Sequence, residues 1–75
     1  MGDVQMSAAP APDRMLAWFA YEHLREPFAS TSKRFHDLAE AIVSTIDAGP
    51  ERTVALRKLL ESKDAAVRAV VKPGG

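Results

Sequence analysis

Apolar residues recur at helical spacing in the middle of the chain, where they form one continuous stripe over residues 35–46. The spacing follows the i, i+3, i+4, i+7 rule of a helix face that packs against a core. The members of the stripe are Phe35, Leu38, Ala39, Ile42, Val43 and Ile46. Residues 47–50, Asp-Ala-Gly-Pro, then break the pattern. We predict a left-handed cap or turn conformation for Gly49 and a new helix that begins at Pro50.

The second helical pattern is predicted to run from about Pro50 to Val71. One stripe consists of Thr53, Leu56, Leu60, Lys63, Val67 and Val70, with Leu59 and Ala66 beside it. A separate stripe alternates basic and acidic residues, namely Arg57, Glu61, Asp64 and Arg68, at a spacing that pairs opposite charges along one face. Because the turn between the two helices is short, they are predicted to form an antiparallel helical hairpin.

A shorter apolar pattern precedes the hairpin. Asp13 is a plausible N-cap for a helix whose inward face carries Leu16, Phe19, Ala20 and Leu24. We predict that Pro27 ends this helix at about Arg25 or Glu26. Residues 27–32 are predicted to be a loop, in which Thr31 or Ser32 caps the next helix.

The predicted domain is the all-α segment 13–72, a short N-terminal helix followed by the hairpin. Residues 1–12 are small, polar and rich in proline, and we predict a disordered tail there. Residues 73–75 are predicted to be a frayed C-terminus, because Pro73 cannot continue a helix.

The chain has only 75 residues and no cysteine, so neither disulfides nor thiolate zinc sites can strengthen its small core. Its two histidines lie far apart in sequence, which makes a metal site made only of protein ligands improbable. Self-association is the remaining way to stabilise such a domain, and we expect a homo-oligomer. No run of about 18 apolar residues and no signal sequence is present, so we expect a cytosolic protein without a membrane segment.

Lysine and arginine balance aspartate and glutamate at a net charge of zero, but the charge is unevenly distributed. Residues 1–32 carry −2, residues 33–48 carry −1 and residues 49–75 carry +3. A neutral protein lacks the broad basic surface of a general nucleic-acid binder, so a small nucleic-acid-binding regulator is the least favoured interpretation. A local basic end can still hold one small anion.

Several residues are candidates for binding rather than catalysis. Tyr21 can stack on a base while its hydroxyl reaches a polar partner, and Trp18 either closes the core or contacts another subunit. Residues 30–34, Ser-Thr-Ser-Lys-Arg, form either a phosphate site at a helix N-terminus or no more than a cap with solvated charges. Neither histidine has partners in sequence that indicate catalysis, and no nucleophile, base or metal motif can be assembled. We therefore expect no enzyme activity and no cofactor.

Three segments together carry a resemblance to a known family. They are residues 19–21 (Phe-Ala-Tyr), residues 33–39 (Lys-Arg-Phe-His-Asp-Leu-Ala) and residues 49–61, which begin Gly-Pro-Glu-Arg-Thr. Over about residues 18–72 the chain resembles the small bacteriophage anti-CBASS proteins that act as cyclic-oligonucleotide sponges. Their hairpin domain is shared with the Thoeris-inhibiting sponges of phages.

The resemblance implies a homohexamer that sequesters cyclic di- and trinucleotides, cyclic GMP-AMP among them, in the cytoplasm of an infected bacterium. It assigns base stacking to Tyr21 and a phosphate contact to a lysine early in the second helix, which is Lys33 or, without a gap, the position of Ser32. It also implies a trinucleotide pocket with a cation near the end of the last helix, either Lys72 or Arg68. The candidate ligand-binding residues are Tyr21, Ser32, Lys33, Arg34, His36, Arg68 and Lys72.

A different function class is also compatible with the residues. The hairpin could be a protein-interaction module that dimerises or inhibits a host protein through Met15, Trp18 and Phe28. In that case a host protein binds and no cyclic nucleotide does.

Overall fold

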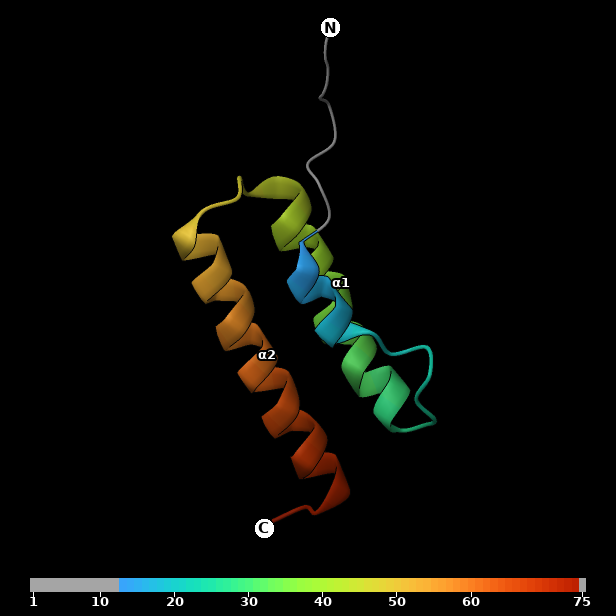
Figure 1. Cartoon of the computed structure of the whole chain (residues 1–75). Coiled ribbons are helices and arrows are strands. Elements are labelled where there is room, and N and C mark those ends of the chain that lie inside the picture. Colours follow the sequence, from blue (N-terminus) through green and yellow to red (C-terminus); the bar gives the residue numbers. More distant parts are fainter. Residues whose placement is uncertain (1–12, 75) are drawn as a thin grey trace, which may run out of the picture.

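The computed structural model describes residues 13–74, and its regular elements there are all helical. A 3-10 helix, η1 (Arg14–Phe19), is followed by the α-helices α1 (Phe28–Thr45) and α2 (Pro50–Val71). The helices α1 and α2 run side by side in opposite directions, and η1 lies against α1 and also contacts α2 (Figure 1). The predicted antiparallel hairpin and the bounds of its second helix are confirmed. The predictions for residues 1–12 and for Gly75 lie outside the described residues.

The predicted first helix is wrong in length and type, because η1 ends at Phe19 instead of continuing to Arg25. Its beginning is as predicted: the Asp13 carboxylate accepts a hydrogen bond from the Met15 amide at 2.9 Å. Its end is set by tertiary contacts. The ring of Phe19 is fully buried in the core, and the Lys63 ammonium of α2 donates to the carbonyl oxygen of Trp18 at 2.6 Å. These contacts outweigh the helical preference of the residues that follow.

The predicted loop at residues 27–32 is also wrong, because α1 already begins at Phe28. The cap is provided from further upstream than expected. The Glu26 carboxylate accepts hydrogen bonds from the amide and the hydroxyl of Ser30. A polar group that accepts hydrogen bonds from the free amides of the first turn stabilises a helix N-terminus. Thr31 and Ser32 therefore lie inside the helix and do not cap it.

The core of the domain lies where η1, α1 and α2 meet. Its buried apolar residues are Phe19, Ala39, Val43 and Leu56, and six partly buried neighbours surround them: Met15, Leu16, Phe35, Ile42, Leu59 and Leu60. The predicted stripe of α1 is only partly covered, since Leu38 remains 51% exposed and Ile46 49% exposed. One partner helix and a short 3-10 turn are too narrow to cover the whole stripe.

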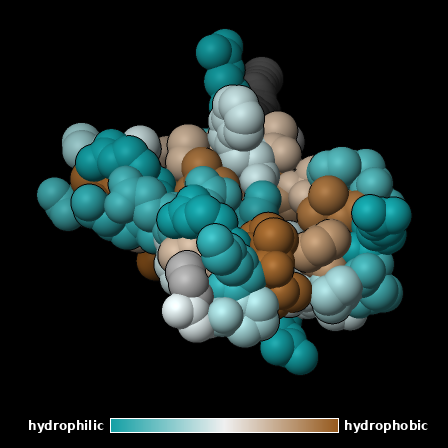
Figure 2. Space-filling model, turned by 90° about the horizontal axis from the view of Figure 1, so that it is seen from below, coloured by the Kyte–Doolittle hydropathy of each residue, from teal (hydrophilic) through white to brown (hydrophobic). Residues whose placement is uncertain are grey.

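Apolar surface is also left at the lower end of the hairpin. Seen from that end, apolar side chains lie between hydrophilic ones on the surface (Figure 2). Among single residues, Trp18 in η1 is 66% exposed, and Val71, the last residue of α2, is 63% exposed. Scattered exposed apolar residues are common in soluble proteins, but these two together with Leu38 and Ile46 make four large ones in a small domain, which indicates surface available for a contact.

The turn between the helices lies where the sequence predicted it. Helix α1 ends at Thr45 and α2 begins at Pro50, which occupies the first turn of the helix as expected. The predicted left-handed conformation of Gly49 is wrong, because its φ of 171° is extended backbone. The end of α1 is formed by Ile46, an extended residue whose amide donates to the carbonyl oxygen of Ile42.

A buried arginine joins this turn to the start of the domain. The Arg52 guanidinium donates through Nη1 to the carbonyl oxygens of Ile46 (2.9 Å) and Val43 (3.3 Å), which belong to the last turn of α1 and the residue after it. Through Nη2 it pairs with the Asp13 carboxylate at 3.0 Å. Only 5% of the Arg52 side chain and 16% of the Asp13 side chain are exposed. Arg52 thus connects α2, the end of α1 and the cap of η1.

Replacing Arg52 with methionine is expected to lower the free energy of unfolding by about 3–5 kcal/mol, because it leaves Asp13 and two carbonyl groups without their partner. The measurement is urea unfolding followed by circular dichroism at one fixed protein concentration. Arg57→Met, at an exposed position of the same helix, is the control and should change the free energy by about 0.5 kcal/mol or less. Equal midpoints for the two variants would contradict a central role for Arg52.

Candidate functional site

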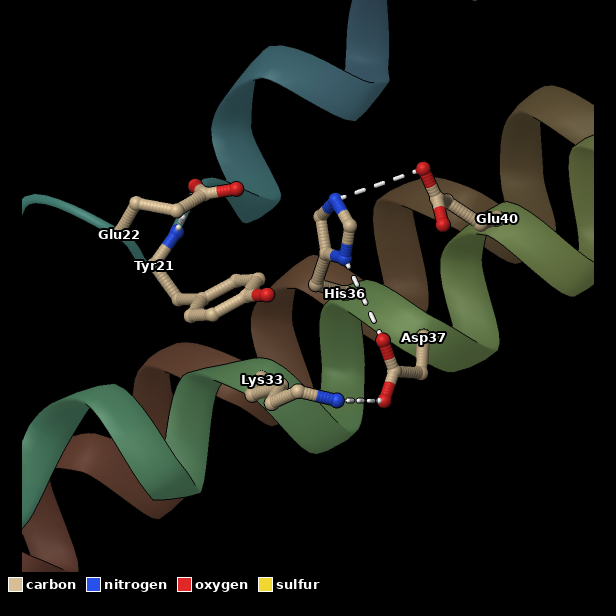
Figure 3. A network of polar contacts seen from close by, with 6 residues as sticks. All are labelled: Tyr21, Glu22, Lys33, His36, Asp37 and Glu40. Atoms are coloured by element: carbon tan, nitrogen blue, oxygen red, sulfur yellow. Dashed lines mark hydrogen bonds and ion pairs between the residues drawn. The ribbon is translucent and has the colours of Figure 1, made fainter.

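Tyr21 lies on the loop between η1 and α1, with its ring against the second and third turns of α1. Its centroid is 5.1 Å from that of the His36 ring, in an edge-on arrangement with an interplanar angle of 63°. The Lys33 ammonium is 5.9 Å from the Tyr21 ring centroid, within the range of a cation–π contact. Figure 3 shows the Tyr21 ring beside Lys33 and His36. An aromatic ring and an ammonium group thus lie together at the surface.

Acidic side chains surround this pair. Asp37 accepts a hydrogen bond from Lys33 at 2.8 Å and lies 3.5 Å from His36 Nδ1, and Glu40 lies 3.6 Å from His36 Nε2. Glu22 accepts a hydrogen bond from the amide of Tyr21 at 3.3 Å. We call Tyr21, Glu22, Lys33, His36, Asp37 and Glu40 the Tyr21 cluster (Figure 3).

The pairing of Lys33 with Asp37 shifts both groups toward their charged forms. Its hydrogen bond to Asp37 raises the pKa of Lys33, and the same bond lowers the pKa of Asp37, with a smaller contribution from His36. The pKa of Glu22 is also lowered, chiefly by hydrogen bonds from its own backbone amide and that of Tyr21. Lys33, Asp37 and Glu22 therefore remain charged at neutral pH.

The cluster carries more negative than positive charge. With a neutral imidazole, the ammonium of Lys33 is opposed by the carboxylates of Glu22, Asp37 and Glu40. One ligand atom each of His36, Asp37 and Glu40 lie within 4.8 Å of one another, a spacing that a metal ion could bridge. Lys33 already neutralises Asp37, and both carboxylates are more than half exposed, so we assign no metal site here.

A second group of residues lies on a different face, around a groove of about 510 Å³ between the loop, α1 and α2. We call it the Arg68 groove. It is lined by Ala17, Trp18, Ala20, His23, Leu24, Ser32, Lys63, Asp64, Val67 and Arg68. The Ser32 side chain is fully buried, and its hydroxyl has no hydrogen-bond partner. Two cations beside an exposed indole are suited to an anionic ligand that also has an aromatic part, whereas the Ser32 hydroxyl is buried beneath the groove and is not accessible to a ligand.

The structure divides the predicted site residues into three sets. Tyr21, Lys33 and His36 come together in the Tyr21 cluster, whereas Ser32 and Arg68 line the Arg68 groove. Within residues 13–74, Arg34 and Lys72 are exposed and belong to neither. Ser32 and Lys33 therefore face different sides of α1, and only Lys33 lies beside Tyr21.

The predicted phosphate site at a helix N-terminus is wrong in one respect. Because α1 begins at Phe28, the amides of Ser32, Lys33 and Arg34 lie beyond its first turn, where backbone amides bond within the helix. They are not the free donors that bind an anion at a helix start. Any phosphate contact at Lys33 must rely on its ammonium group.

Sequence reasoning missed Asp37, Glu40 and Lys63. The first two carried a signal, because Lys33 and Asp37, like His36 and Glu40, are four residues apart and share a helix face. Lys63 carried none, since its contacts with Trp18 and with the ring of Phe19 join residues distant in sequence.

Comparisons of the chain with protein-family models, with curated proteins and with solved structures found no match. In the part of the chain that the structure describes, each helix is too short or too polar to cross a membrane. The function proposed below therefore depends on the geometry of the site and on the resemblance noted in the sequence.

Ser32→Ala is expected to raise the free energy of unfolding by about 1 kcal/mol, because a buried hydroxyl without a partner costs about 1–3 kcal/mol. Part of any gain comes from the higher helix propensity of alanine. Ser62→Ala, at an exposed position inside α2, measures that part alone. Thermal or urea unfolding should show a larger gain for Ser32→Ala than for Ser62→Ala. A loss at Ser32 would mean that the hydroxyl has a partner in solution.

Proposed function

We propose that this protein is a non-catalytic sponge of bacteriophage origin that binds cyclic dinucleotides in the cytoplasm of the infected host and so withholds them from a CBASS effector. The observation that carries the proposal is the placement of Tyr21 beside Lys33 on an accessible surface. An aromatic ring binds a base by stacking, and an ammonium group next to it can contact the phosphate of the same nucleotide. The resemblance noted in the sequence assigns stacking to Tyr21 and the phosphate contact to Lys33 or to the position of Ser32, and of these two Lys33 is the one beside Tyr21.

Among the described residues, the hydrogen bonds of the Tyr21 cluster do not include one to a side chain that could act as a nucleophile, which agrees with binding and not with reaction. His36 faces two carboxylates, but within residues 13–74 no hydrogen bond joins any of the three to a serine or threonine hydroxyl that could act as a nucleophile, and the hydroxyls of Ser44 and Thr45 donate to the Ala41 carbonyl. The cluster lies on the outer face of α1, where Lys33, Asp37 and Glu40 are more than half exposed. Binding without reaction requires only stacking, charge and a second surface to enclose the ligand.

The Arg68 groove supports the trinucleotide part of the proposal. Arg68 lies in the last turn of α2 and lines the groove. The resemblance implies a pocket with a cation near the end of the last helix and a hydroxyl in the loop after Tyr21. Residues 22–29 contain no hydroxyl side chain, so the groove matches the cation of that pocket only. Among the two cations considered, Arg68 is the one that lines the groove, so we propose Arg68 and not Lys72 for this role.

Assembly into a homo-oligomer, with six subunits as the resemblance implies, is part of the same proposal. Neither the Tyr21 cluster nor the Arg68 groove encloses a ligand within one chain, and Trp18 and Leu38 are more than half exposed. A second subunit would cover these apolar side chains and supply the missing wall. The competing interpretation, a protein-interaction module, is favoured chiefly by the exposure of Trp18, because Met15 and Phe28 are partly buried.

Tyr21→Ala is expected to weaken the binding of cyclic GMP-AMP by about fivefold to 150-fold, since one base–aromatic stack contributes about 1–3 kcal/mol. Lys33→Ala should weaken it as well, through the loss of a phosphate contact. Isothermal titration calorimetry measures both. Lys58→Ala is the matched control, because Lys58 is an exposed lysine that also pairs with a carboxylate on its own helix. Wild-type affinity in both site variants would contradict the assignment.

Native mass spectrometry is expected to show a multiple of the 8.2 kDa chain mass, with cyclic dinucleotides bound to the assembly. Leu38→Asp should reduce the assembly to smaller species if Leu38 is covered by a neighbouring subunit, because burial of an unpaired carboxylate is costly. Glu61→Asp, an exposed charge-conserving change on α2, should leave the mass unaltered. A wild-type monomer that binds no cyclic nucleotide but co-purifies with a host protein would favour the interaction module.

A further inference from the structure

The ammonium of Lys33 is already engaged in the structure without ligand. It donates a hydrogen bond to Asp37 at 2.8 Å, and this pair is more than half exposed. A ligand phosphate that binds Lys33 must therefore compete with an internal carboxylate. Glu22 and Glu40 add further negative charge nearby, which repels an anionic ligand. At neutral pH, the carboxylates of the Tyr21 cluster therefore weaken the binding of a phosphate at Lys33.

His36 is placed to change that balance. Its Nδ1 lies 3.5 Å from Asp37 and its Nε2 lies 3.6 Å from Glu40, so each nitrogen faces a different carboxylate. A neutral imidazole has one N–H group and can satisfy only one of the two. A protonated imidazole has an N–H group on both nitrogens and forms an ion pair with each.

The groups that face His36 belong to two segments. From the loop after η1 come Tyr21, whose ring meets His36 edge-on, and Glu22, whose charge interacts with it. From α1 itself come Lys33, Asp37 and Glu40. Within residues 13–74, the recorded ionic contacts of His36 are with carboxylates only. A proton on His36 therefore offsets one of three negative charges around a single ammonium.

We propose that His36 is a proton switch for ligand binding at the Tyr21 cluster: its protonation places a positive charge beside Asp37 and Glu40, offsets the carboxylates that oppose a phosphate at Lys33 and makes cyclic dinucleotides bind more tightly at lower pH. This inference rests on the proposed function. The imidazole gains the proton, no covalent bond to the ligand changes, and the phosphodiesters of the ligand stay ionised throughout the range in which histidine titrates.

The sign of the effect follows from linkage. A bound anion favours the protonated imidazole, so ligand binding raises the affinity of His36 for a proton and binding takes up protons. Affinity then rises as the pH falls through the range in which histidine side chains gain a proton. One additional unit charge at about 4 Å in an aqueous surface site corresponds to about a fivefold change in affinity.

The test is isothermal titration calorimetry of the intact protein with cyclic GMP-AMP between about pH 5.5 and pH 8, the window in which histidine changes charge. We expect wild-type affinity to be about fivefold higher at the acidic end. Near the middle of the window, the apparent binding enthalpy should depend on the ionisation enthalpy of the buffer, which reports proton uptake. His36→Gln should abolish both effects. His23→Gln changes the other histidine, which lies in the Arg68 groove, and should preserve them.

Asp37→Asn provides a second, independent variant at an exposed position. It removes the carboxylate that competes for Lys33, so binding near pH 8 should become at least as tight as that of the wild type near pH 5.5. Glu61→Gln, which removes an exposed carboxylate paired with Lys58 on α2, is the control and should not tighten binding. Circular dichroism verifies that each variant is folded.

The outcomes separate the two proposals. Binding that is equally tight at all pH values, or pH dependence that persists in His36→Gln, overturns the proton switch and leaves the sponge function intact. Unchanged or weaker binding of Asp37→Asn near pH 8 also overturns it. The absence of cyclic dinucleotide binding by the wild type at every pH overturns the proposed function, and the switch with it.

Discussion

The ion pair between Arg52 and Asp13 determines how the segments of this small domain are held together. The guanidinium group of Arg52, carried by the first turn of α2, donates hydrogen bonds to the cap residue of η1 and to two carbonyl groups at the end of α1. Burial of these charges is costly, and it is compensated only because Arg52 Nη1 and Nη2 both find acceptors. The ion pair holds the start of η1 beside the turn between α1 and α2, and η1 brings Phe19 into the core.

The position of Phe19 in turn places the candidate site. Phe19 anchors the end of η1, and the contact of Lys63 with the Trp18 carbonyl holds that end against α2. The chain then passes over α1 as a loop, so that Tyr21 meets His36 and Lys33 instead of continuing on a helix of its own. A longer first helix would turn these side chains in other directions. The early end of η1 is thus what creates the surface on which the proposed ligand stacks.

The two candidate binding surfaces lie on different faces of α1 and differ in charge. The Tyr21 cluster has an aromatic ring and one ammonium among carboxylates, whereas the Arg68 groove has two cations, one carboxylate and a buried hydroxyl. In neither does one chain surround a small molecule. A domain with four buried apolar residues has little interior in which to form a closed pocket, so enclosure by neighbouring subunits is the simplest way to complete either site.

Local sequence was sufficient for the hairpin itself. The sequence predicted the break at residues 47–50, the start of α2 at Pro50 and its end at Val71. Proline and a repeated apolar spacing affect only residues close to them in sequence, so a local pattern is enough to place these features. The same kind of signal indicated Asp13 as a cap.

Tertiary structure decided the rest. The end of η1 and the burial of Arg52 depend on contacts between residues up to 45 positions apart, which no local sequence pattern can indicate. Sequence alone also left Ser32 and Lys33 as alternatives for one role. The structure places them in different environments: Ser32 is buried toward the Arg68 groove, and Lys33 is exposed beside Tyr21. Adjacent residues on a helix point about 100° apart, and only the packing of the helix determines which of them meets the partner.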